Sequence, residues 1–356
     1  MTWVADDILA LRLRNQCLSC QSDSGVTELV AHLGAVQSQD YPAAKWALGM
    51  RLRGATNASL EAAFAAGKIL RTHVLRPTWH FVAPADIRWM LALTGPRIKL
   101  SMAARDRFLG VDDGVVACAS RILVREMEGG NSLTRVEVAS ALRAGGIDLV
   151  DPSAVSHLIS RVELEGLVCS GPPRGAQQTW ALLDERVPPA APRDPDEAVA
   201  ELTWRYFRGH GPALAQDCSW WSGLTLGDVK RGLEMNRYRL TSIAHDGLSY
   251  WFADSGPVSM SPGVHLLPNF DEYTVAYRAR ELYYDRETNR TGNARLDVPF
   301  ADVIVAEGRV AGRWKCSPRH AAANLSSGWS IEASAEAQRQ LELAKRRYVE
   351  FYAPAT

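Results

Sequence analysis

The chain lacks a net charge and has no long apolar run. Its 356 residues include 40 Lys plus Arg and 40 Asp plus Glu, so the overall charge indicates neither a nucleic-acid nor a membrane partner. No apolar stretch reaches the roughly 18 residues that a membrane span needs, and the N-terminus lacks the basic and then apolar pattern of a signal peptide. We therefore expect a cytoplasmic protein without a membrane-spanning segment.

Cysteine is also scarce. Six cysteines are spread over the chain, which is typical of reduced thiols rather than of a disulfide framework. Cys17 and Cys20 form a C-x-x-C pair, but structural zinc needs four ligands and no second pair lies nearby in the sequence. The sequence predicts neither a metal site nor a cofactor.

Apolar residues and charge are present in ordinary amounts, but the charge is distributed unevenly. Apolar residues make up 47% of the chain, enough for two to four small domains and too many for a disordered protein. Residues 42–110 contain eleven Lys or Arg and three acids, whereas residues 181–201 contain six acids, two bases and four prolines, as in an exposed linker. The basic region fits either a DNA-binding surface or helix faces in solvent.

Three short helices and a hairpin are predicted near the N-terminus. Thr27 is expected to cap the first helix, and Pro42 stands at the start of the second. Ser59 is expected to cap the third helix, which stops at Gly67. Two apolar and β-branched runs, 69–75 and 78–82, then flank Arg76 and Pro77. This order of elements is that of a winged helix.

A second copy of the pattern begins with a capping box at Thr134 and Glu137. Asp151 is expected to cap the next helix, which buries one apolar face formed by Val155, Leu158, Ile159 and Val162. This helix occupies the position of a recognition helix and carries Arg161 on another face. Residues 167–170 and 179–183 then form a wing with Arg174 at its tip.

A third helical unit and a region of strands follow the linker. Helices are expected over residues 196–209, 213–221 and 225–234. Short strands follow, and they suit a small β-barrel; they are expected over residues 248–253, 264–267, 302–305 and 310–315. A helix over residues 335–352, capped by Ser334, closes the barrel.

The sequence thus predicts an α+β fold with three tandem winged-helix domains and a small C-terminal β-barrel. The three winged helices are expected over residues 1–115, 116–190 and 191–242. The barrel with its terminal helix is expected over residues 243–356. Tandem winged helices bind DNA more often than any other partner, but a fold does not fix a function.

Motifs of distinctive composition occur in order along nearly the whole chain. They are Gln37-Ser38-Gln39-Asp40, the segment LRTHVLRPTWHF at 70–81, Gly211-Pro212, Trp220-Trp221-Ser222-Gly223, the segment LLPNFDEY at 266–273, Tyr277-Arg278 and Gly312-Arg313-Trp314. A Q-x-Q motif alone carries no information, but the whole set resembles the AlkZ/YcaQ-like family of winged-helix DNA glycosylases.

The resemblance implies three winged helices and a β-barrel shaped around duplex DNA, with Gln37 and Gln39 at the catalytic centre. YcaQ-like members carry aspartate at the second of these positions, so Gln39 places the chain on the AlkZ-like side. That branch is implied to unhook interstrand cross-links made by an azinomycin-type alkylator and to give self-resistance. Ser38 departs from the apolar residue of the family pattern.

Glutamine suits the hydrolysis of a base that already carries a positive charge. An N7-alkylguanine is an activated leaving group, so the enzyme needs no acid to protonate it. A glutamine carbonyl can accept a hydrogen bond from the attacking water, and its amide can donate to sugar or phosphate oxygens. Because glutamine cannot ionise, it replaces the usual carboxylate of glycoside hydrolysis only for labile, cationic lesions.

Six basic side chains are predicted to contact DNA: Arg71, Arg76 and His80 on the first hairpin, and Arg51, Arg161 and Arg174 elsewhere. His73 and His80 fit an ordinary packed histidine as well as a DNA contact. Acids close to DNA repel phosphate, so Asp271 and Glu272 are expected to orient a basic partner such as Arg278.

Two functions remain open at this point. The first is a monofunctional glycosylase that acts as a monomer, in the cytoplasm near the nucleoid, on N-alkylpurines in double-stranded DNA. Its lesion pocket is expected to be more open than in base-flipping enzymes, because a base tethered to both strands cannot easily leave the stack. The second is a non-catalytic winged-helix transcriptional regulator, which would bind DNA and release no base.

Overall fold

The chain divides into two units, each with its own network of contacts. The computed structural model describes residues 3–253, 256, 263–285, 300–316 and 325–354. Unit 1 comprises Met1–Glu61 and Val199–Thr356, and unit 2 comprises Ala62–Ala198. Neither unit coincides with one of the four predicted domains. Among the described residues, no helix is long and apolar enough to cross a bilayer.

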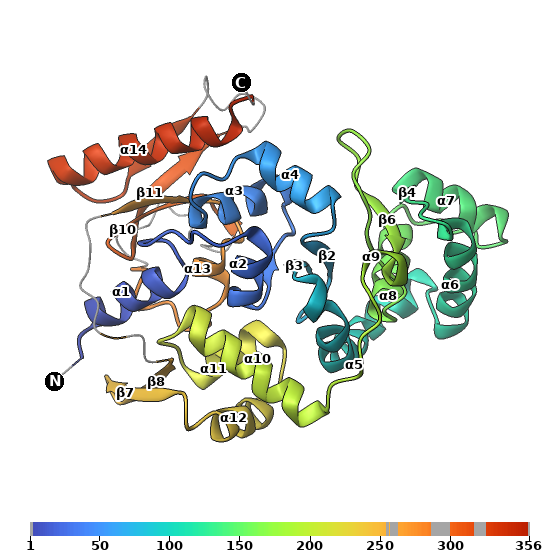
Figure 1. The fold of residues 1–356 in the computed structure, drawn as a ribbon, viewed down its shortest axis with the longest axis horizontal. Coiled ribbons are helices and arrows are strands. Elements are labelled where there is room, and N and C mark those ends of the chain that lie inside the picture. Colours follow the sequence, from blue (N-terminus) through green and yellow to red (C-terminus); the bar gives the residue numbers. More distant parts are fainter. Residues whose placement is uncertain (1–2, 254–255, 257–262, 286–299, 317–324, 355–356) are drawn as a thin grey trace. The chain divides into compact units, whose positions relative to one another are not determined.

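The N-terminal part of unit 1 is helical around one short strand (Figure 1). Its elements are α1 (Ala5–Asn15), α2 (Val26–Leu33), β1 (Val36–Gln37), α3 (Tyr41–Arg51) and the first part of α4 (Asn57–Ala65), which continues into unit 2 from Ala62. Two predicted caps are wrong. Helix α2 begins after Gly25, so Thr27 lies inside it. Helix α4 begins after Thr56, because Thr56 and Ser59 exchange hydrogen bonds between hydroxyl and amide and the Leu60 amide bonds to the Thr56 carbonyl.

The helices that follow the linker agree with the sequence pattern. They are α10 (Pro195–His210), α11 (Ala215–Ser222) and α12 (Leu226–Met235). Gly223 ends α11 in the left-handed region with φ of 72°, where glycine has no Cβ to clash, and Thr225 caps α12. A hairpin follows, of which only the second strand is predicted by the sequence: β7 (Thr241–His245) and β8 (Leu248–Phe252).

A four-stranded antiparallel sheet and a terminal helix complete unit 1. The strands are β9 (Val264–Leu267), β10 (Val303–Ala306), β11 (Arg309–Lys315) and β12 (Ser326–Trp329), in the order β12-β11-β10-β9. The short α13 (Glu272–Val275) follows β9, and α14 (Ala335–Tyr352) is capped by Ser334 as predicted. The described strands between residues 241 and 329 form this open sheet and the separate β7–β8 hairpin, so the predicted closed barrel is not confirmed.

Helix α14, red in Figure 1, packs on β9 and α3. The Trp46 ring meets the rings of Tyr348 and Phe351 edge-on, with centroids 4.9 and 5.3 Å apart. A Cβ at Gly49 would lie 2.3 Å from the Phe351 ring, so the approach of the two helices needs glycine there. The Trp46 indole donates to the Leu266 carbonyl at 2.7 Å. Helix α3 is therefore fixed to the sheet and to α14.

Unit 2 begins with the predicted hairpin and continues with a long helix. Strands β2 (Leu70–His73) and β3 (Trp79–Val82) pair antiparallel, with Leu70 opposite Val82 and His73 opposite Trp79. The remaining elements are α5 (Pro84–Leu109), α6 (Asp113–Met127), β4 (Leu133–Thr134), α7 (Arg135–Ala144), α8 (Ala154–Leu164), β5 (Val168–Ser170), β6 (Thr179–Leu182) and α9 (Leu183–Arg186).

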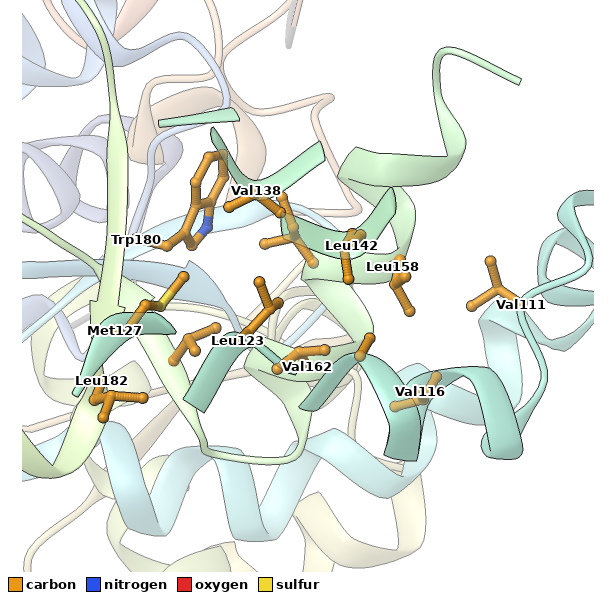
Figure 2. Close-up of a cluster of buried hydrophobic side chains, with 13 residues drawn as sticks. Val111, Val116, Leu123, Met127, Val138, Leu142, Leu158, Val162, Trp180 and Leu182 are labelled. Carbon is orange, nitrogen blue, oxygen red and sulfur yellow. The ribbon is translucent and has the colours of Figure 1, made fainter. Parts of the chain in front are cut away.

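Helices α6, α7 and α8 and the sheet β4-β6-β5 follow the order of a winged helix. Figure 2 shows side chains from all three helices and β6 gathered in one core, including Leu123, Leu142, Leu158 and Trp180. The capping box at Thr134 is confirmed. The expected cap at Asp151 is wrong, because α8 begins after Ser153 and Asp151 accepts the Ser153 amide at 2.7 Å.

Candidate active site and DNA-contacting residues

The Q-x-Q segment connects β1 to helix α3 in unit 1. Gln37 ends β1 with 5% of its surface exposed, Ser38 is fully buried, and Gln39 is exposed. Asp40 follows as the N-cap of α3. The segment therefore runs from the interior to the surface within three residues and directly precedes a helix that is fixed to the sheet.

The main chain of Gln37 is held by a fully buried carboxylate. The Gln37 amide donates to Oε1 of Glu272 at 2.6 Å. The other oxygen, Oε2, accepts the Trp221 indole N–H at 2.9 Å and lies 3.3 Å from Nε2 of His210. Glu272 has no exposed surface, so its charge depends on these N–H groups for compensation.

Asp40 holds the other end of the segment. Its Oδ1 accepts the Ala43 amide at 3.1 Å, as an N-cap does, and its Oδ2 accepts the side-chain amide of Asn269 at 3.3 Å. Each carboxylate oxygen therefore has a structural partner. This arrangement suits a residue that fixes the backbone better than one that removes a proton from water.

The contacts of Arg51 are structural and do not support its prediction as a DNA contact. Its guanidinium donates to both carboxylate oxygens of Asp271, at 2.7 and 2.8 Å, and to the Gln16 carbonyl at 3.0 Å. Burial alone would lower the pKa of Arg51, but the charge and hydrogen bonds of Asp271, together with the charge of Glu272, raise the pKa overall. With 1% of its surface exposed, Arg51 cannot reach phosphate.

Residues of the LLPNFDEY segment thus hold the backbone of the Q-x-Q segment and of the helix that follows it. Asp271 orients a basic partner as expected, although this partner is Arg51 rather than Arg278, and Glu272 accepts the Gln37 amide. The sequence assigns no role to Trp221 or His210, whose rings also face Glu272. The sequence shows these motifs but does not show which of their residues contact one another. Gln37 lies 235 residues from Glu272 along the chain, and Trp221 lies 51 residues from it.

Lys45 is the lysine nearest to the two glutamines in the sequence. Its Nζ donates to Oε1 of Glu61 at 2.5 Å and to Oδ1 of Asn57 at 2.6 Å. The side chain is buried. The amine is therefore occupied by partners on α4, which does not suit a nucleophilic amine.

The first hairpin, in unit 2, presents one of its three predicted DNA contacts at the tip. Arg76 is half-buried beside the exposed Pro77. Arg71 is mostly buried, with its guanidinium 4.3 Å from the centre of the Trp79 ring. His80 is fully buried and its Nδ1 lies 2.9 Å from the Thr78 carbonyl, so a direct phosphate contact by His80 is not supported.

His73 behaves as a packed histidine. Its Nδ1 lies 2.5 Å from Oε2 of Glu163, and the same carboxylate oxygen accepts the His73 amide at 3.0 Å. Its ring packs against Trp79, with centroids 4.6 Å apart. Of the two interpretations of His73, the structural one agrees with these contacts.

The predicted recognition helix, α8, is covered within unit 2. It packs on α5 and on β2 as well as on α6. Arg161 is 5% exposed and forms ion pairs with Asp106 and Asp113, which does not support its prediction as a DNA contact. The sequence does not reveal this, because the covering helix α5 lies outside the repeated pattern.

Arg174 lies at the tip of the wing as predicted. It is exposed and forms an ion pair with Glu137. Hydrogen bonds from Arg174, and from the Thr134 cap, lower the pKa of the Glu137 carboxyl to about 2. Such an exposed pair contributes little to stability and can exchange for another anion.

No described group of three or more His, Cys, Asp or Glu side chains is arranged to hold a metal ion. The six cysteines are free thiols. Burial raises the pKa of Cys17, which disfavours the reactive thiolate form of that residue.

Comparisons with known proteins agree on one family. A model of the family "DNA glycosylase AlkZ-like" matches residues 30–351. A curated relative from Streptomyces sahachiroi, "Interstrand DNA cross-link repair glycosylase", is 22% identical over 335 residues that cover 86% of each chain. The solved structure of Streptomyces sahachiroi DNA glycosylase AlkZ is 18% identical and has a TM-score of 0.79, over 99% of this chain and 97% of that one.

The family model spans most of the chain, including the Q-x-Q segment, the hairpin and the LLPNFDEY segment. The expected resemblance is therefore confirmed, and a regulator without catalytic activity is not favoured. The chain belongs to the AlkZ-like DNA glycosylase family, whose members are hydrolases of N-glycosyl bonds in DNA.

Proposed function

We propose that this glycosylase releases cationic N-alkylpurines, such as N7-alkylguanine, from duplex DNA, with Gln37 and Gln39 at the reacting bond. The observation that carries the proposal is the anchoring of the Q-x-Q segment at both ends, by Glu272 at Gln37 and by the Asp40 cap of α3. Two neutral amides on a fixed backbone suit catalysis by positioning rather than by proton transfer.

The chemistry follows from what a glutamine can do. Its carbonyl oxygen accepts a hydrogen bond from the attacking water and turns the negative end of its dipole toward the developing sugar cation. Its N–H groups donate to the sugar or phosphate oxygens and hold the nucleotide in place. A neutral side chain provides less stabilisation than a carboxylate, so the leaving base must already be positively charged.

The reaction is proposed to be monofunctional. A lyase reaction needs an amine that attacks the sugar, and Lys45, the nearest lysine in sequence, is bound to Glu61 and Asn57. Water is therefore the nucleophile, and the product is an intact strand with an abasic site.

DNA is proposed to contact Arg76 on the first hairpin and Arg174 on the wing, both of which reach the surface. Arg71 contributes indirectly, because its guanidinium stacks on Trp79 and stiffens the hairpin. Arg51, Arg161 and His80 are not part of this proposal, because their side chains are buried.

A third winged helix is proposed in unit 1. Helices α10, α11 and α12 are followed by the hairpin β7–β8, which repeats the order of the second winged helix. Its domain would then extend to residue 252 rather than end at residue 242.

The cognate lesion is proposed to be a bulky or cross-linking adduct of a genotoxic natural product, so that the enzyme protects its producer. The support is the name of the curated relative, which repairs interstrand cross-links. Cross-link unhooking is the same hydrolysis, because breaking one of the two N-glycosyl bonds separates the strands.

The test is incubation of the protein with duplex DNA that contains one N7-methylguanine. We expect release of the free base and an abasic strand that is cleaved only by later alkali treatment, with no adduct trapped by borohydride. Binding without base release would favour the regulator instead, and a trapped adduct would contradict the monofunctional reaction.

A further inference from the structure

We infer that Glu272 is a positioning residue for the excision reaction, which acts by fixing the main chain of Gln37. The inference rests on the proposed function, in which the Gln37 side chain lies at the reacting bond. Nothing in the family match assigns a role to this carboxylate.

Glu272 lies where three separate segments of unit 1 meet. Its oxygens face the Gln37 amide from β1, the Trp221 indole from α11 and the His210 ring from the end of α10. Each of these side chains is at least nine-tenths buried. Burying a carboxylate at this depth is costly unless N–H groups compensate its charge. A residue that served only to fill space at position 272 would therefore be apolar.

The contact uses the amide of Gln37 and not its side chain. Fixing the amide fixes the direction of the Cα–Cβ bond, from which the glutamine side chain extends. The Asp40 cap fixes the backbone three residues later. A long side chain whose base moves by about 1 Å can lose about 100-fold in rate, because the reaction needs a near-attack geometry.

This geometry separates the anchor from the group that it positions. Gln37→Ala removes the side chain and keeps the backbone amide that Glu272 binds. Glu272→Gln keeps the Gln37 side chain but replaces one acceptor oxygen by an N–H₂ group. This group cannot accept a hydrogen bond from the Gln37 amide or from the Trp221 indole. If Glu272 acts through Gln37, the two effects on the rate cannot add.

Asp217 provides a matched control. It too is a fully buried acid of unit 1 whose oxygens accept main-chain N–H groups, from Leu214, Arg278 and Ala279 at 2.9–3.0 Å. None of these contacts reaches the Q-x-Q segment. Asp217→Asn therefore imposes a similar structural defect away from the glutamines.

The experiment is a double-mutant cycle on the full chain. Single-turnover excision of N7-methylguanine at saturating enzyme, thermal unfolding and duplex binding are measured for Glu272→Gln, Gln37→Ala, the double variant and Asp217→Asn. We expect Glu272→Gln to slow excision about 10- to 100-fold, with duplex binding within a few-fold. In the Gln37→Ala background it should slow excision by less than about threefold. Asp217→Asn should lose thermal stability but keep the excision rate within about threefold.

Two outcomes would overturn the inference: an unchanged rate in Glu272→Gln, or an equal slowing by Glu272→Gln with and without the Gln37 side chain. A wild-type rate in Gln37→Ala would overturn the proposed function itself and the inference with it. If Glu272→Gln does not fold, Trp221→Phe replaces it, because it removes only one N–H bond to Glu272 and keeps a large ring. It should slow excision about 3- to 10-fold, and a wild-type rate would overturn the inference.

Discussion

Buried charged residues define the surroundings of the two glutamines. Asp271 and Glu272 are adjacent in the LLPNFDEY segment, and Asp271 pairs with Arg51 of α3; all three side chains are nearly or fully inaccessible to solvent. Paired charges of this kind do not make a fold more stable than apolar side chains would, but they fix a unique geometry when every partner is present. Here Glu272 holds the Gln37 amide, and Asp271 holds Arg51 at the end of α3, the helix that follows the Q-x-Q segment.

Removal of Arg51 tests its structural role. Arg51→Ala should lower the free energy of unfolding by about 3–5 kcal/mol, because Asp271 keeps a buried charge without its partner. The matched control is Arg53→Ala, two residues later, since Arg53 pairs with Asp23 at the surface and should cost less than about 1 kcal/mol. Urea unfolding measures both. A weaker affinity for DNA in Arg51→Ala at unchanged stability would restore Arg51 as a DNA contact.

The excision rate should be nearly independent of pH between about pH 6 and pH 9. Neither glutamine titrates, the charge of the substrate comes from alkylation, and each oxygen of Asp40 already has a partner. Single-turnover excision of N7-methylguanine at fixed ionic strength measures the profile. A roughly tenfold fall per pH unit below pH 7 would instead indicate that a histidine or carboxylate base activates the water, and would leave the glutamines only to hold the substrate.

At the scale of elements, the β2–β3 hairpin is the part of unit 2 most suited to contact the phosphate backbone. Arg76→Ala should weaken binding to all duplexes alike and reduce the slope of log affinity against log salt by about one, because each phosphate contact releases about one counterion. Arg339→Ala on α14, which removes an exposed arginine paired with Glu336, serves as the control. Fluorescence anisotropy at several salt concentrations measures both slopes. An unchanged slope in Arg76→Ala would remove the hairpin tip from the interface.

The sequence predicts most helices and strands but not which of their faces are buried against other elements. Thr134, Thr225 and Ser334 cap their helices because a hydroxyl stands three residues before an amide that needs an acceptor. The same rule fails at Ser59, because the Thr56 hydroxyl accepts the Ser59 amide and caps the helix three residues earlier. Helix α8 was assigned to the DNA surface by its place in the repeat, whereas α5 covers it. Contacts between distant segments, such as that of Gln37 with Glu272, leave no local pattern to read.

At the scale of the whole molecule, the basic region of the sequence is not one basic surface. Its arginines and lysines pair with acids from other parts of the chain: Arg51 with Asp271, Arg53 with Asp23, Arg88 with Asp184 and Lys99 with Glu165. These four acids offset half of the excess of eight positive charges between residues 42 and 110. DNA binding must depend on a few positions rather than on the total charge.

Stability should fall in mildly acidic solution because of His265 in β9. Burial, with the nearby charges of Arg51 and Arg347, lowers the pKa of His265 to about 4. A histidine whose pKa is lower in the folded state stabilises the fold above its unfolded pKa of about 6.5 and loses this contribution as the pH falls from 6.5 toward 4. Thermal unfolding of His265→Gln should therefore change less between pH 7 and pH 4.5 than that of the wild type. His245→Gln, in the hairpin β7–β8, should keep the wild-type dependence, and equal losses in the wild type and His265→Gln would contradict the prediction.

The central claim is that Gln37 and Gln39 carry out the hydrolysis, and replacement of each by alanine tests it most directly. Single-turnover excision of N7-methylguanine at saturating enzyme is measured together with binding to the same duplex. Each replacement should slow excision by roughly one to three orders of magnitude, as the loss of one hydrogen-bonding group in the transition state does, with binding within a few-fold of the wild type. Excision at the wild-type rate in both variants would contradict the claim.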